Sequence, residues 1–120
     1  MNYNIKGTGV AVSDELRTYV ERQLAHADKL LGADPSARAD IELEYNQLRD
    51  GGKYRAEFTA NSHGHSYRAE CMGSSLHEAI DLAGARLTAE LRANKKKRLH
   101  VLHRTGTRVK EYLRGWRNKM

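Results

Sequence analysis

The sequence predicts an α+β domain with the element order β-α-β-β-β-α, a four-stranded mixed sheet, two helices on one face of it, and a basic C-terminal tail. Two segments with apolar residues at spacings of three and four predict the helices. Four short segments in which apolar and polar residues alternate predict the strands, and turn-forming residues separate them. Each element has one apolar face, so both helices should cover the same face of one sheet. A length of 120 residues fits one such domain.

The first two elements are a strand and a helix. The strand is expected at residues 1–8, where Tyr3 and Ile5 alternate with polar residues. The helix should begin at Ser13, a favourable N-cap residue, and stop at Gly32. Its apolar face should consist of Leu16, Tyr19, Val20, Leu24, Ala27, Leu30 and Leu31.

Three further strands should follow, separated by turns at residues 33–36, 49–52 and 61–65. A right-handed crossover makes the first two strands parallel, and hairpin connections make the others antiparallel. The core-facing residues are predicted to be Ala39, Ile41, Leu43, Tyr45, Tyr54, Ala56, Phe58, Ala60, Tyr67, Ala69 and Cys71. The other sheet face should be a solvated, ion-paired surface rather than a binding site, formed by Glu42, Glu44, Arg55, Glu57, Arg68 and Glu70.

The second helix is expected over Ser75–Arg98. Ser75 followed by Glu78 is the capping-box pattern of a helix start, and Gly84 is the only weak helix former inside. Its apolar face should consist of Leu76, Ile80, Ala83, Leu87 and Leu91. Five of the seven residues 92–98 are cations, which is more than interaction with the helix dipole explains.

Charge is distributed unevenly along the chain. Residues 1–85 contain nine Lys/Arg and thirteen Asp/Glu, a net charge of −4. Residues 86–120 contain twelve Lys/Arg and two Asp/Glu, a net charge of +10. This asymmetry indicates a nucleic-acid or anionic-membrane partner, whereas a surface that only aids solubility does not require such segregation.

Residues 99–120 are predicted to form a basic tail outside the domain of residues 1–98. Within the tail, Tyr112 and Trp116 lie at helical spacing among cations, in a stretch of about three turns that is marginal as an isolated helix. These aromatic rings either stack on unpaired bases or dock the tail on its own domain. A helix on an anionic membrane is a weaker alternative, because the stretch has few large apolar residues.

Sequence patterns for catalysis and metal binding are absent. Neither His63 with His65 nor His100 with His103 is joined by a second cluster of metal-ligating residues at a zinc spacing. The chain has no P-loop, no dinucleotide-binding glycine pattern and no nucleophile elbow. Cys71 is expected to be a buried structural thiol. We therefore expect no enzyme activity, cofactor, metal or small-molecule substrate.

The cysteine content and the hydropathy predict a cytoplasmic protein without a membrane partner. A single cysteine cannot form an internal disulfide, which suits a reducing compartment. The N-terminus lacks a signal-peptide pattern, and no apolar run is long enough to span a membrane.

With these elements in this order, the sequence resembles the family of ribosome hibernation-promoting factors and ribosome-associated inhibitor A over about residues 1–98. The resemblance rests on MNYNIKG at the start, VSDELRTYVERQL at 12–24 and SLHEAIDLAGARLTAELR at 75–92. It implies two roughly parallel helices and binding to the small ribosomal subunit, through rRNA and nearby ribosomal proteins, and to the whole ribosome. Occupying the channel for mRNA and tRNA silences idle ribosomes in that family.

The resemblance also transfers to individual residues. It matches basic family positions to Arg17, Lys29, Arg86, Arg92 and Lys95. The chain departs from the family at Gln23, His26 and Ala89, where basic residues are common in other members.

We therefore predict a non-enzymatic protein that binds rRNA in the decoding channel. Its RNA-contacting residues are expected to be Arg17, Arg22, His26, Lys29, Arg86, Arg92, Lys95, Lys96, Lys97, Arg98, Arg104, Arg108, Lys110, Arg114, Trp116 and Arg117. Two alternatives are a general double-stranded RNA-binding module, which also has helices on one face of a small sheet, and a protein-interaction module that acts through the tail.

Overall fold

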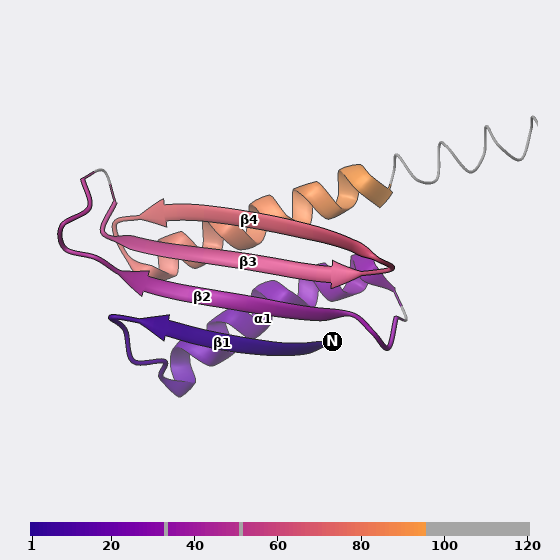
Figure 1. The fold of residues 1–120 in the computed structure, drawn as a ribbon, viewed down its shortest axis with the longest axis horizontal. Coiled ribbons are helices and arrows are strands. Elements are labelled where there is room, and N and C mark those ends of the chain that lie inside the picture. Colours follow the sequence, from indigo (N-terminus) through magenta and orange to yellow (C-terminus); the bar gives the residue numbers. More distant parts are fainter. Residues whose placement is uncertain (33, 51, 96–120) are drawn as a thin grey trace, which may run out of the picture.

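The computed structural model describes residues 1–32, 34–50 and 52–95 and confirms the predicted order of elements (Figure 1). The elements are β1 (Asn2–Thr8), α1 (Asp14–Leu31), β2 (Arg38–Tyr45), β3 (Tyr54–Ser62) and β4 (His65–Gly73). A second helix begins at residue 76 and continues through residue 95, the last described residue. The predicted end of this helix at Arg98 and the predicted basic tail lie outside the described residues.

The four strands form one mixed sheet in the order β1-β2-β3-β4. β1 pairs with β2 in parallel, and the other two pairs of neighbours are antiparallel, as predicted. One row across the sheet joins Ile5 to Ile41, Ile41 to Phe58, and Phe58 to Ala69. All four strands therefore place apolar side chains in register on one face.

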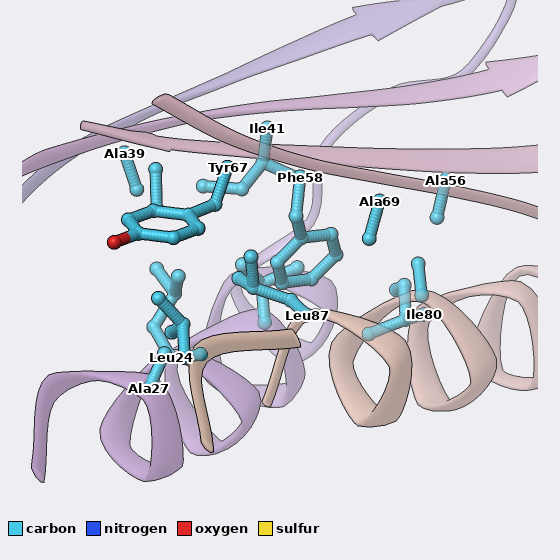
Figure 2. Packing of buried hydrophobic residues seen from close by; sticks show 14 of the residues in the cluster. Leu24, Ala27, Ala39, Ile41, Ala56, Phe58, Tyr67, Ala69, Ile80 and Leu87 are labelled. Atoms are coloured by element: carbon cyan, nitrogen blue, oxygen red, sulfur yellow. The ribbon is translucent and has the colours of Figure 1, made fainter. Parts of the chain in front are cut away.

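The core lies between that sheet face and the two helices, which both lie on it (Figure 1). Figure 2 shows Phe58 and Ala69 pointing from the sheet toward Ile80 and Leu87 of the second helix. Phe58 and Ile80 are completely buried, and burial of a side chain of this size contributes about 1.5–3 kcal/mol. Cys71, predicted to be buried, is only half-buried against the core.

Both helices begin at the predicted serine residues. The Ser13 hydroxyl accepts a hydrogen bond from the Leu16 amide at 3.2 Å, and the Ser75 hydroxyl accepts one from the Glu78 amide at 3.1 Å. The capping box of the second helix is only half formed, because the Glu78 carboxylate accepts a hydrogen bond from the Ser74 hydroxyl at 2.8 Å.

The two hairpins differ from their predicted turns. β3 and β4 extend into the predicted turn and leave only His63 and Gly64 between them, with φ of 51° and 77°. Two residues with positive φ match the twist of the strands that they join. The β2–β3 loop is longer than predicted, and the Asn46 amide closes it by donating to the Lys53 carbonyl at 2.8 Å.

Asp34 fastens the α1–β2 loop to the β3–β4 hairpin. Its carboxylate accepts hydrogen bonds from the Ser36 amide and hydroxyl at 2.9 and 2.6 Å, the Ser62 hydroxyl at 2.7 Å and the His63 amide at 3.1 Å. The hydrogen bonds from Ser36 and Ser62 hold the pKa of Asp34 well below its ordinary value of 3.8. The end of the domain where α1 ends is thereby tied to the hairpin.

The two helices are in close contact at Gly84. A Cβ atom at this position would lie 2.9 Å from the Gln23 Cβ and 2.5 Å from the Gln23 Oε1. A real Cβ does not approach another carbon so closely, so the helices would have to separate. The residue that is the weakest helix former in the second helix is therefore needed for helix packing.

We predict that Gly84→Ala lowers the free energy of unfolding by about 1–3 kcal/mol, because overpacking outweighs the gain in helix propensity. Urea unfolding measures the change. The matched control is Ala85→Gly at an exposed position, which should lower it by about 1 kcal/mol through propensity alone. Stabilisation by Gly84→Ala would contradict the close contact with Gln23.

We also predict that Asp34→Asn destabilises the domain at pH 7 and that the difference from the wild type shrinks in acid. Because folding lowers the pKa of Asp34, its contribution is present above the unfolded-state pKa of about 4 and is lost as the pH falls toward the folded-state value. Urea unfolding at pH 7 and pH 3 measures the difference. Asp40→Asn, at an exposed strand position, is the control for charge, and equal behaviour of the two variants would refute the prediction.

Candidate nucleic-acid interface

The two helices lie side by side and run in the same direction. Near their starts, His77 Nε2 lies 3.3 Å from a carboxylate oxygen of Glu15. Further along both helices, Gln23 packs on Gly84. Because the contacting residues advance together, the helices are parallel and their C-terminal halves lie at the same end of the domain (Figure 1).

Asp81 links the helices at their solvent-facing side. The Tyr19 hydroxyl donates to the two carboxylate oxygens of Asp81 at 2.8 and 2.7 Å, and Gln23 Nε2 donates to one of them at 3.0 Å. The hydrogen bond to Asp81 raises the pKa of Tyr19, and partial burial adds to this effect. The carboxylate is thus engaged in helix packing.

The net charge of the helical layer changes sign along the length of the helices. The first halves of the helices, residues 14–21 and 76–85, contain one Lys/Arg and five Asp/Glu, a net charge of −4. The second halves, residues 22–31 and 86–95, contain five Lys/Arg and two Asp/Glu, a net charge of +3. Because the helices are parallel, the two acidic halves lie together and the two basic halves lie together.

Five of the predicted RNA-contacting residues gather at the basic end. Arg22, His26 and Lys29 follow at spacings of four and three on α1, which places them on one ridge. Lys95 and Leu30 line one small hollow, so the second helix meets the same part of α1. We call the set the cationic end; its members are Arg22, His26, Lys29, Arg92 and Lys95, all of them exposed.

Two other predicted residues lie apart from the cationic end. Arg17 lies near Tyr3 of β1, and Tyr3 donates a hydrogen bond to Glu21. Arg86 projects to the opposite side of the layer, where its guanidinium donates to the backbone carbonyl of Glu70 in β4 at 3.1 Å. Sequence spacing alone did not separate these two residues from the others.

Nine predicted residues lie outside the described part of the chain. They are Lys96, Lys97, Arg98, Arg104, Arg108, Lys110, Arg114, Trp116 and Arg117.

Sequence reasoning missed the contribution of the β3–β4 turn to this end of the domain. His63, predicted to be a surface histidine of a loop, lines the same hollow as Leu30 and Lys95. Its Nε2 lies 3.9 Å from a carboxylate oxygen of Asp34. No local sequence signal reports this proximity, because it depends on how the turn and the helices come together.

The outer face of the sheet is ion-paired, as predicted, but its central residue is not solvated. Arg55 is only 8% exposed, and its guanidinium pairs with four carboxylates, those of Glu42, Glu44, Glu57 and Glu70. Arg68 pairs with Glu57 at 2.9 Å. Burial alone would raise the pKa of Glu57, but the hydrogen bonds from Arg68 and Arg55 lower it overall. Paired arginines on this face are poorly placed to bind phosphate.

The described residues also bear on metal binding and on membrane insertion. Among residues 1–32, 34–50 and 52–95, no group of three or more His, Cys, Asp or Glu side chains is arranged to hold a metal ion. No helix in the described part is long and apolar enough to cross a membrane.

Residues 3–99 match the family described as sigma 54 modulation protein / S30EA ribosomal protein. The chain belongs to this family. Among curated relatives, the ribosome hibernation promotion factor of Bacillus subtilis (strain 168) is 27% identical over 97 residues, which cover 81% of this chain and 50% of that protein. The factor of the same name from Picosynechococcus sp. is 30% identical over 110 residues, which cover 88% of this chain and 56% of that protein. The chain spans about half the length of these relatives.

Solved structures show the S30EA-type fold. The N-terminal domain of Protein Y from Thermus thermophilus has a TM-score of 0.66 and 29% identity, over 78% of this chain and 98% of that one. A ribosomal subunit interface protein from Coxiella burnetii has a TM-score of 0.62 at 20% identity, over 80% of this chain and 99% of that one, and this likeness shows the fold alone.

We predict that Asp81→Asn lowers the pKa of Tyr19 toward the ordinary tyrosine value of 10.0, because the hydrogen bond to a carboxylate is its main cause of elevation. NMR titration of ring-labelled tyrosine measures it. Tyr3, whose raised pKa depends on Glu21, is the internal control and should not change. An unchanged titration of Tyr19 would show that it is not bound to Asp81.

Proposed function

We propose that this chain is a non-enzymatic ribosome hibernation factor that binds rRNA in the decoding channel of the small subunit and blocks the mRNA and tRNA sites. The cationic end carries the proposal, because its cations lie together on two parallel helices and are followed in sequence by Lys96, Lys97 and Arg98. The name that the curated relatives share, ribosome hibernation promotion factor, supports the ribosome as the target.

Electrostatics supports RNA as the ligand of the cationic end. Lys and Arg side chains that neutralise phosphates release counterions, and this supplies most of the sequence-independent affinity for RNA. The acidic ends of the helices repel phosphate, and the arginines of the outer sheet face are already paired with glutamates. The domain should therefore enter an RNA channel with its cationic end first.

The basic tail extends this interface in the proposal. Residues 1–98 act as the ribosome-binding domain, and residues 99–120 add phosphate contacts through Arg104, Arg108, Lys110, Arg114 and Arg117 and stacking through Trp116. The partners are rRNA, nearby ribosomal proteins and the whole ribosome, and the site of action is the cytoplasm.

Co-sedimentation over a salt series tests the proposal, with whole ribosomes, separated subunits and naked duplex RNA as ligands. We expect binding to ribosomes and small subunits, with a log–log salt slope of about −4 to −6 for about six neutralised phosphates. Equal binding to naked duplex RNA would favour a general RNA-binding module. Salt-independent binding that is lost when residues 105–120 are deleted would favour a protein-interaction module.

Two charge-reversal variants locate the interface. Arg22→Glu with Arg92→Glu changes the cationic end, and Arg17→Glu with Arg86→Glu makes the same change of net charge on the same helices away from it. We expect the first variant to bind ribosomes at least tenfold more weakly than the second and to reduce the salt slope by about 2, because two phosphate contacts are lost. Equal weakening by both variants would refute the cationic end as the interface.

A further inference from the structure

Within the described part of the chain, β4 pairs only with β3, so its other edge is open. The two-residue turn makes Ser62 and His65 the first hydrogen-bonded pair, and such pairs alternate along antiparallel strands. The backbone groups that point away from β3 therefore belong to Ser66, Arg68, Glu70 and Met72. The position of Arg86 agrees with this alternation, because its guanidinium binds the outward-pointing carbonyl of Glu70 at 3.1 Å.

The charged residues along this edge are complementary to those of the same edge in a second, antiparallel copy. Arg68 and Glu70 flank Ala69, and both side chains lie on the outer face of the sheet. Antiparallel pairing of two β4 strands about Ala69 would set Arg68 of each copy opposite the partner's Glu70. Opposite charges at directly facing positions stabilise a strand pair. The other edge strand, β1, has Lys6 as its only charged residue and offers no such match.

Apolar surface also gathers beside the β4 edge. Of the three large hydrophobic side chains that are exposed in the described residues, two lie here: Met72, 42% exposed, and Leu82, 47% exposed. Together with Cys71 and Arg86 they line an open hollow of about 550 Å³ between β4 and the second helix. An open edge flanked by exposed apolar side chains favours pairing with another strand.

We propose that this edge is a self-association surface, on which β4 pairs antiparallel with β4 of a second copy of this chain about a twofold axis at Ala69. Several registers pair the outward-pointing residues with one another, but only the axis at Ala69 faces Arg68 with the partner's Glu70. In this register Ser66 faces the partner's Met72. Arg86 opposes pairing, because its guanidinium occupies the Glu70 carbonyl at this edge and must move away before a second strand can bind. This proposal does not depend on ribosome binding.

Disulfide cross-linking of the full chain tests the register. In a Cys71→Ser background, a Ser66→Cys protein is mixed with a Met72→Cys protein under mild oxidation. Facing residues of a hydrogen-bonded pair lie about 5.5 Å apart at Cα, within disulfide range. The mixture should form a cross-linked heterodimer, and neither single variant alone should cross-link comparably. Cross-linking of each variant with itself, or no excess in the mixture, overturns the proposal.

Charge swapping tests the interaction itself by sedimentation velocity over a concentration series. Arg68→Glu should weaken self-association about tenfold or more, because like charges then face each other at two places. Adding Glu70→Arg restores opposite charges across the pair and should recover association. Arg86→Ala should strengthen self-association, because it frees the Glu70 carbonyl. Thermal unfolding checks that each variant is folded.

The proposal fails if the wild-type chain and the Arg86→Ala variant are both monomeric at the highest concentrations reached, whether because the edge does not pair or because residues 96–120 cover it. It also fails if Arg68→Glu and the double swap behave alike. Co-sedimentation of the same variants with ribosomes is scored separately, so loss of self-association with intact ribosome binding counts against this inference alone.

Discussion

Packing of the two helices directly against each other is the constraint on which the rest of this domain depends. Gln23 packs on Gly84, which has no side chain, and this allows the helices to approach closely. The Asp81 carboxylate then links the helices by accepting hydrogen bonds from Tyr19 and Gln23. With both helices on one sheet face and in one direction, the favourable charges of each helix start and each helix end add up across the layer. The charge distribution that stabilises each single helix thereby gives the whole domain an acidic end and a basic end.

The outer sheet face carries charge of both signs but presents a different kind of surface. Its arginines are held by glutamates on neighbouring strands, and Arg55 is buried among four of them. Removing one member of such a buried network leaves charges unpaired, which is costly. This face is therefore best understood as part of the folded structure, whereas the exposed and more loosely paired cations lie at the ends of the helices.

Gln23 departs from the family pattern, and its position between the helices gives a physical reason for the difference. The family resemblance of the sequence leads us to expect a basic residue at this position, so that glutamine would suggest a lost RNA contact. Here the Gln23 side chain is half-buried between the helices and donates a hydrogen bond to Asp81. The exposed cations of α1 are instead Arg22, directly before Gln23, and Lys29, with His26 between them on the same ridge.

The sequence by itself determined the order of the elements, the apolar faces and both helix starts, because periodicity and capping are local properties of the chain. It also determined that cations concentrate toward the second helix end. Only the tertiary structure decided which cations come together, since this depends on contacts between residues far apart in the chain. Arg86 lies at the β4 edge and Arg17 lies beside β1, whereas Lys95 lies near Leu30 and His63. The need for Gly84 and the burial of Arg55 likewise arise only when separate elements pack together.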